Sequence, residues 1–185
     1  PAAAAPATPP TEKVPLKTKL AFGVGSMVDN LTGNSIHQLA NPVYNIGLGV
    51  NPAVIGAVLA VGRLLDAVTD PLIGGISDNF RSRCGRRRPL IIAGAFLTGP
   101  IILATFSLPR GWSPLAYSIY FAVAMLLFFP AFTLFSVPLK GFQLELTRDY
   151  HERTRISAVV AFLMPIGGIL ASWLFALTQY SGFED

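Results

Sequence analysis

The sequence predicts an all-α integral membrane protein, built as a bundle of about five transmembrane helices. Hydrophobic residues make up 52% of its 185 residues, charged residues make up only 13%, and the mean hydropathy is +0.54. This composition is too apolar for an ordinary soluble domain. A bilayer core of about 30 Å requires about 20 mainly apolar helical residues. Five stretches meet this requirement: 20–48, 53–77, 90–108, 115–137 and 156–177.

These apolar stretches indicate helices rather than the strands of a β-barrel. They are long, continuous and rich in Leu, Ala, Ile and Gly, whereas barrel strands are short segments of alternating polarity. Residues 1–16 are rich in Pro and Ala and predict a disordered cytoplasmic tail. The bundle then occupies residues 17–185.

Basic residues alternate with the predicted helices and orient the bundle. Only Arg110 lies in a connection on one side, while eleven basic residues fall on the other: Lys13, Lys17, Lys19, Arg81, Arg83, Arg86, Arg87, Arg88, Arg148, Arg153 and Arg155. Cytoplasmic loops carry the excess of positive charge. We therefore expect a multi-pass protein of the cell (plasma or inner) membrane with a cytoplasmic N-terminus. The run "RSRCGRRRP" would also suit a nucleic-acid-binding patch, but apolar spans flank it on both sides, so we expect no nucleic-acid partner.

The stretch "GRLLDAVTDPLIGG", residues 62–75, places three charged residues inside an apolar run. Asp66 and Asp70 are four residues apart, so on a helix they share one face with Arg63. Two carboxylates so close in a low dielectric repel each other unless a proton or cation lies between them. Intramembrane charges also commonly mark an ion or substrate path. The alternative is that Arg63 pairs with Asp66 to hold helices together, which leaves Asp70 unpaired.

The first predicted helix carries a polar stripe at helical spacing. Its members recur at steps of 4, 3, 4 and 4, with Gln38 at the edge and Asp29 off the stripe: Asn30, Asn34, His37, Asn41 and Asn45. The stripe favours a water-filled, substrate-lining face. The alternative is a set of interhelical hydrogen bonds, which Asn and His also supply in membranes.

Three motifs resemble those of the glycoside-pentoside-hexuronide:cation symporters, the melibiose-permease-like branch of the major facilitator superfamily. They are "GRLLDAVTDPLIGGISD", "RSRCGRRRP" and "ELTRDYHERTR", and the resemblance spans about residues 16–183. It implies the N-terminal part of a 6+6 helix bundle, with the C-terminal half absent from this chain and needed as its partner. It also implies cation-coupled symport of a sugar, glycoside or uronide by alternating access.

The resemblance also implies a cation site. Its matching positions are Asp66, Asp70 and Thr133, and Thr69 stands where melibiose permease has an asparagine. Carboxylate and hydroxyl oxygens are ligands that a hard cation prefers. The coupling cation, Na⁺ or H⁺, is therefore expected here, and no other cofactor is expected.

The implied substrate site departs from that of the permease. Asn30 and Ser136 replace two aspartates, Lys140 replaces a tryptophan, and Ala161 replaces an arginine. The swap of two acids for neutral groups, together with the lysine, makes the pocket more positive and favours an anionic substrate such as a hexuronide. The expected substrate or pathway residues are Asn30, Asn34, His37, Asn41, Arg63, Ser136 and Lys140. The expected cytoplasmic gate motif comprises Asp78, Arg81, Gly85, Arg86, Arg87 and Arg88.

Two alternatives to symport stay open from the sequence. One is an uncoupled uniporter of the same fold, and the other is a membrane sensor or subunit that transports nothing. An enzyme is not expected, because the sequence suggests no nucleophile and base pair, no Cys and His metal site and no phosphate loop. The single Cys84 excludes an internal disulfide.

Overall fold

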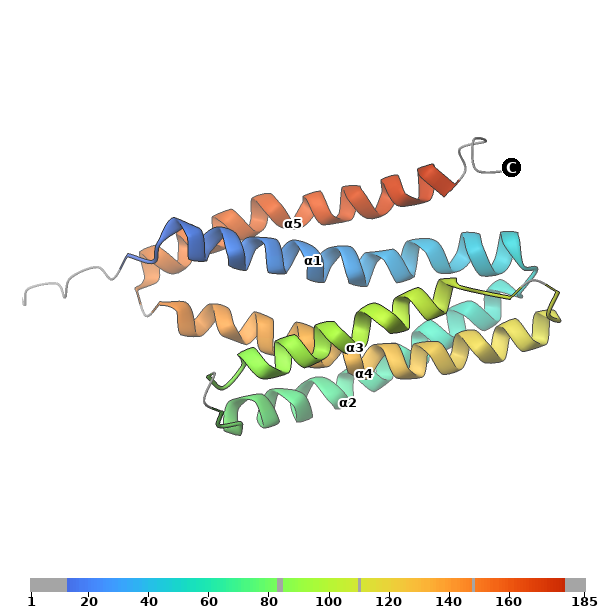
Figure 1. Cartoon of the computed structure of the whole chain (residues 1–185), viewed down its shortest axis with the longest axis horizontal. Coiled ribbons are helices and arrows are strands. Elements are labelled where there is room, and N and C mark those ends of the chain that lie inside the picture. The colour runs from blue at the N-terminus through green and yellow to red at the C-terminus, as the bar shows by residue number, and fades with distance from the viewer. Residues whose placement is uncertain (1–12, 83–84, 110, 148, 179–185) are drawn as a thin grey trace, which may run out of the picture.

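The computed structural model describes residues 13–82, 85–109, 111–147 and 149–178, and within these ranges the regular structure is helical (Figure 1). The predicted all-α class is confirmed. The helices are α1 (Leu16–Ala40), the π-helix η1 (Asn41–Gly47), α2 (Pro52–Asn79), α3 (Arg88–Phe106), α4 (Pro114–Leu146) and α5 (Tyr150–Thr178).

The first helix differs most from its expected course over 20–48. It begins earlier, at Leu16, and changes from α to π geometry at Asn41. Pro42 is the reason we assign, because its ring has no N–H to donate and would collide with the carbonyl four residues earlier. A π-helical segment widens the turn and accommodates such a residue.

The polar ends of α4 and α5 also extend beyond the expected apolar limits. α4 continues through Pro138 to Leu146 instead of stopping at 137, and α5 begins at Tyr150 instead of 156. Asp149 accepts a hydrogen bond of 2.8 Å from the backbone N–H of His151. This interaction satisfies a free donor of the first turn, so the helix can start in a polar segment.

Four described helices are long and apolar enough to cross a membrane: α2, α3, α4 and the Tyr150–Trp173 part of α5. The sequence analysis expected five. Among the described helices α1 falls short because Lys17, Lys19 and Asp29, together with its polar stripe, lower its hydropathy. It nevertheless lies alongside α5 over much of its length (Figure 1).

The helices pack as a pair, α1 with α5, beside a group in which α4 contacts both α2 and α3 (Figure 1). Glycines let the backbones approach closely. A Cβ atom at Gly94 of α3 would overlap the backbone of Phe135 in α4. A Cβ atom at Gly167 of α5 would overlap the carbonyl of Met27 in α1. Small residues at helix contacts are typical of membrane bundles, where close packing replaces the hydrophobic effect.

One hydrophobic core cluster lies where the end of α1, η1, the start of α2 and the first part of α4 meet, and partly buried side chains of α3 pack against it. The rings of Tyr44 and Phe121 are 4.5 Å apart, and both residues are fully buried. The Tyr44 hydroxyl donates to the carbonyl of Thr105 at 2.5 Å. A buried phenol needs such a partner, so this contact fixes the π-helical segment against α3.

Basic residues gather at one end of the bundle. The start of α1, the α2–α3 connection and the α4–α5 connection all lie there (Figure 1). Buried Glu152 is 2.6 Å from the ammonium of Lys19 and 2.7 Å from the guanidinium of Arg155. The directions of the helices therefore place these three basic segments at the same end of the bundle, as the positive-charge pattern of the sequence predicts.

We predict that Gly94→Ala destabilises the full-length protein, because a methyl group there meets the α4 backbone, which cannot move aside cheaply. The expected loss is about 1–3 kcal/mol, typical of overpacking. Gly99→Ala on the same helix is the control, since a Cβ atom there meets open space. Thermal unfolding in detergent measures both. Equal melting temperatures for the two variants would contradict the α3–α4 packing.

Candidate functional site

A polar cavity of about 190 Å³ lies between α1, α2 and α4. Phe128, Phe129 and Phe132 of α4 form its aromatic side, and Met164 of α5 also borders it. The polar lining comes from three helices: Asp29, Asn30, Asn34, His37, Arg63, Asp66 and Lys140. Five of the expected substrate or pathway residues thus border one cavity, and Asp66 of the expected cation site joins them.

Arg63 connects α2 to α1 across this cavity. Its Nη2 lies 3.0 Å from Nε2 of His37. Arginine only donates hydrogen bonds, so Nε2 of His37 is the acceptor and the ring proton is on Nδ1. Within the described residues Arg63 makes no ion pair with Asp66, which does not support the structural-pair alternative considered above.

Asp66 instead interacts with α4. The hydroxyl of Thr133, itself buried, donates to Oδ1 of Asp66 at 3.4 Å. Asp70, one turn along α2, is exposed and lies within electrostatic range of Asp66, but it does not border the cavity. The hydroxyl of Thr69 donates to the carbonyl of Leu65 at 3.0 Å. Its oxygen keeps its acceptor capacity while the proton is engaged.

Asp29 borders the cavity, although the helical spacing placed it off the polar stripe. Its Oδ2 is 3.9 Å from Nζ of Lys140, and its side chain is only 8% exposed, against 67% for Lys140. Asp29 borders the cavity although it lies off the stripe, because α4 approaches α1 on the side that carries Asp29. The signal available in the sequence was an acid and a base, Asp29 and Lys140, left without partners in apolar spans.

Other expected members of the site lie elsewhere. Asn41 and Asn45 are in η1, and the Asn45 amide donates to the carbonyl of Val50 at 2.8 Å. Ser136 is buried without bordering the cavity, and its Oγ has no hydrogen-bond partner in the described part of the chain. Gln38 accepts a hydrogen bond of 3.1 Å from Ser172 of α5. The stripe therefore serves helix contact at Gln38 and lines the cavity only in its N-terminal part.

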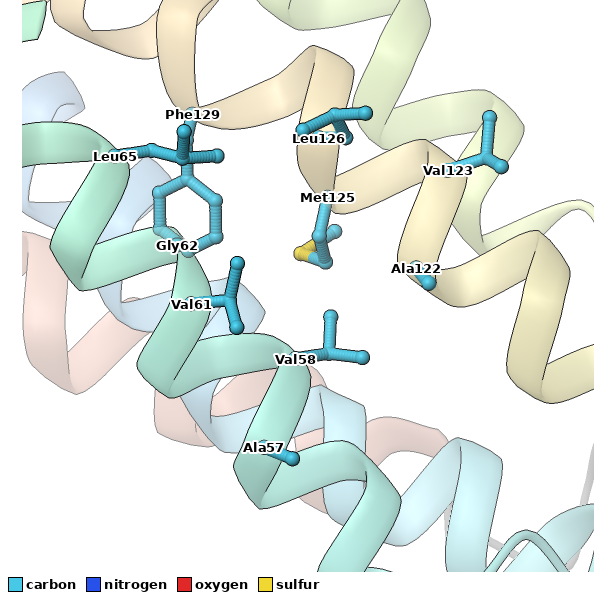
Figure 2. Close-up of a pocket in the computed structure, with 10 residues that line it drawn as sticks. All are labelled: Ala57, Val58, Val61, Gly62, Leu65, Ala122, Val123, Met125, Leu126 and Phe129. Carbon is cyan, nitrogen blue, oxygen red and sulfur yellow. The ribbon is translucent and has the colours of Figure 1, made fainter.

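Close contact between α2 and α4 positions the charged residues. Figure 2 shows the Phe129 ring of α4 against Gly62 of α2, where an added Cβ atom would overlap the ring. The two residues also border an apolar groove of about 360 Å³, lined by side chains such as Val58, Leu65 and Met125. Because Gly62 directly precedes Arg63, this contact sets how far Arg63 and Asp66 lie from α4.

The expected gate residues form an ionic cluster at the basic end of the bundle. Arg87 contacts Asp78 at 2.5 Å and Glu145 at 3.0 Å, which joins the ends of α2 and α4. Arg86 donates to the carbonyl of Asp78 at 3.2 Å. Gly141 was not expected in this cluster, yet a Cβ atom there would overlap the Arg87 guanidinium. Glycine at position 141 therefore leaves the space that the Arg87 guanidinium occupies against α4.

The remaining gate residues shape or flank this cluster. Gly85 has a φ of +100°, a backbone conformation that favours glycine. The Arg88 guanidinium lies 6.0 Å from the centre of the Phe142 ring, and Arg81 is exposed. Cys84, Arg83, Arg110 and Arg148 lie outside the described residues.

Comparison with known proteins places this arrangement in a family. The model of the MFS/sugar transport protein family matches residues 21–179. The chain therefore belongs to this family of multi-pass membrane transporters, and the predicted relation to sugar:cation symporters of the major facilitator superfamily is confirmed.

Individual relatives agree with this assignment. An uncharacterised symporter of Synechocystis, sll1374, is 32% identical over 94% of this chain and 33% of its own length. The putative glycoside/cation symporter YagG of Escherichia coli is 30% identical over 85% of this chain and 34% of its own length. The isoprimeverose transporter of Lactiplantibacillus pentosus is 23% identical over 97% of this chain and 38% of its own length. The chain thus spans about a third of the length of the curated relatives it matches.

We predict that single cysteines at Asn34 and His37 of the full-length protein react with small hydrophilic thiol reagents, because both positions border the cavity. A bound glycoside should slow the reaction several-fold. Leu39→Cys, on the same helix but not bordering the cavity, is the control and should react slowly with or without glycoside. The rate of labelling by mass spectrometry measures this. Equal inertness at all three positions would return the stripe to a packing role.

Proposed function

We propose that the chain forms the N-terminal part of a secondary active transporter that carries a sugar or glycoside together with Na⁺ or H⁺ by alternating access. The observation that supports this most is the position of Asp66. It is a carboxylate on a membrane-spanning helix, it borders the cavity, and it has a hydroxyl partner on a second helix. Intramembrane carboxylates placed in this way mark ion and substrate paths.

The coupling cation in this proposal is held by oxygen atoms near the boundary of α2 and α4. Asp66 and Thr133 supply two of them at 3.4 Å from each other. Asp70 supplies a second carboxylate from the next turn, and the Thr69 hydroxyl oxygen remains able to accept. A hard monovalent cation prefers such ligands. A proton on one carboxylate would equally relieve the repulsion between Asp66 and Asp70.

The sugar in this proposal occupies the cavity beside that cation. Asn30, Arg63 and Lys140 offer hydrogen-bond donors to its hydroxyls. Asp29, Asp66 and the amide oxygen of Asn34 offer acceptors, since the Asn34 amide nitrogen donates to Asn30 at 2.9 Å. Phe128, Phe129 and Phe132 offer apolar surface to its C–H faces. A few converging polar groups on an apolar wall are typical of small-molecule sites. The printed names of relatives include a glycoside/cation symporter and an isoprimeverose transporter, which supports this substrate class.

Alternating access in this proposal requires the C-terminal half of the transporter, since substrate sites in such folds lie between two helix repeats. In this proposal the start of α1 lies on the cytoplasmic side, because the segments that carry most of the basic residues gather at that end of the bundle. The Arg87 cluster then lies on the cytoplasmic side, where it joins the ends of α2 and α4 and serves as a gate contact.

We predict that Asp66→Asn and Asp70→Asn each remove the Na⁺ or pH dependence of glycoside uptake by the full-length protein, whereas exchange down the sugar gradient survives. Thr133→Ala should raise the cation concentration for half-maximal uptake by a smaller factor, because a neutral hydroxyl contributes less than a carboxylate. Uptake into proteoliposomes across a range of Na⁺ concentration and pH measures this.

Thr154→Ala is the matched control for this series. Its hydroxyl donates to the backbone of its own helix at Tyr150, away from the cavity, so uptake should keep its cation dependence. Uptake by the unmodified protein that depends on neither Na⁺ nor pH would indicate an uncoupled uniporter. A folded Asp70→Asn variant that kept the cation dependence would remove Asp70 from the cation site. Absence of solute flux in the unmodified protein would favour a sensor.

A further inference from the structure

Building on the proposed function, we propose that Asp29 and Lys140 act as one specificity-determining pair, which makes the cavity select an uncharged glycoside over a glycoside that carries a carboxylate. Asp29 is the deciding member. It cancels the positive charge that Lys140 brings to the cavity, so a substrate carboxylate finds no net attraction there.

The charges around the cavity are balanced. Among the described residues that border it, Arg63 and Lys140 are basic, and Asp29 and Asp66 are acidic. His37 accepts from Arg63 and adds no charge in that arrangement. Counting the substitutions from the permease gave a positive pocket and an anionic substrate, because that count included Lys140 and left out Asp29. With Asp29 beside it, Lys140 adds no net positive charge to the cavity, which favours a neutral substrate.

The geometry of the pair suits hydroxyl groups. The separation of 3.9 Å between Oδ2 of Asp29 and Nζ of Lys140 is long for an ion pair, so the contact is loose. The ammonium has three donors, and its side chain is 67% exposed, so donors remain for a ligand in the cavity. Asp29 and Lys140 together offer an acceptor and a donor to neighbouring hydroxyls of a sugar.

Asp29 has a reason to accept from a ligand. Its Oδ1 is enclosed and has no hydrogen-bond partner within the described residues. An enclosed carboxylate oxygen without a donor is costly. A change of the Asp29 side-chain torsions that turns this oxygen toward the cavity would let it accept a hydrogen bond from a sugar hydroxyl.

A substrate carboxylate fits this pair less well. It would approach the negative charge of Asp29, which borders the cavity. Sharing the Lys140 ammonium would bring two carboxylates close together around one positive charge, which raises their mutual repulsion. Specificity thus comes from an unfavourable contact with the wrong substrate as well as from favourable contacts with the right one.

The test compares uptake of methyl glucoside with methyl glucuronide, and of methyl galactoside with methyl galacturonide, in proteoliposomes of the full-length protein. The members of each pair differ in the oxidation of one carbon, so the uronide to glycoside ratio of kcat/KM isolates the effect of charge. The unmodified protein should prefer the neutral glycoside. Asp29→Asn should raise the ratio at least tenfold, because it leaves Lys140 uncompensated.

Two further variants keep the proposal testable if Asp29→Asn does not fold. Lys140→Met should lower the ratio below that of the unmodified protein, because it leaves Asp29 uncompensated. The double variant Asp29→Asn, Lys140→Met carries neither charge and should restore a ratio close to the original one. Asp149→Asn is the control, because it removes an acid outside the cavity and asparagine also caps helices.

The outcomes separate this inference from the proposed function. Preference of the unmodified protein for the uronides, or ratios that stay unchanged in folded Asp29→Asn and Lys140→Met, would overturn the role of the pair while sugar transport stands. Failure of the unmodified protein to take up any of the four sugars would overturn the proposed function, and the inference would fall with it.

Discussion

A charged side chain inside a membrane needs its partner within the protein, because lipid cannot solvate it. In this chain that requirement brings α1, α2 and α4 together around one cavity. Three polar contacts there join two different helices, and the apolar surfaces between them leave space for a ligand. The contacts are Lys140 with Asp29, Arg63 with His37, and Thr133 with Asp66. Their loose or neutral character leaves donors and acceptors that a bound solute can engage.

Glycine contacts give the rest of the bundle the rigidity that such a cavity needs. Gly94 brings α3 onto α4, Gly167 brings α5 onto α1, and Gly62 brings α2 onto Phe129. The α1–α5 pair and the α2–α3–α4 group are each closely packed, and they meet more lightly with each other. Polar contacts across the cavity therefore add to the apolar packing of η1 and the end of α1 against α4 in connecting the two parts. A ligand that replaces these contacts would change how the two parts are held.

Hydropathy predicted the all-α membrane class because helices that face lipid need apolar side chains along their length. It could not predict the helix ends, which depend on caps such as Asp149. Helical spacing identified Asn30, Asn34 and His37, since they share one face. It did not show that Asp29, which lies off that stripe, also borders the cavity, because the face that a neighbouring helix reaches depends on how the helices pack. For the same reason the sequence could not pair Arg63 with His37 or place Gly141 under Arg87.

In the proposed mechanism the cation and the sugar bind adjoining parts of one site and stabilise each other. Isothermal titration calorimetry of the full-length protein tests it most directly, with the Kd of a transported glycoside measured at several Na⁺ concentrations and pH values, and the Kd of Na⁺ measured with and without glycoside. The account predicts that Na⁺ or H⁺ lowers the glycoside Kd by about 5–150-fold, and that glycoside strengthens cation binding by the same factor. A glycoside Kd that is the same at every Na⁺ concentration and pH would contradict it.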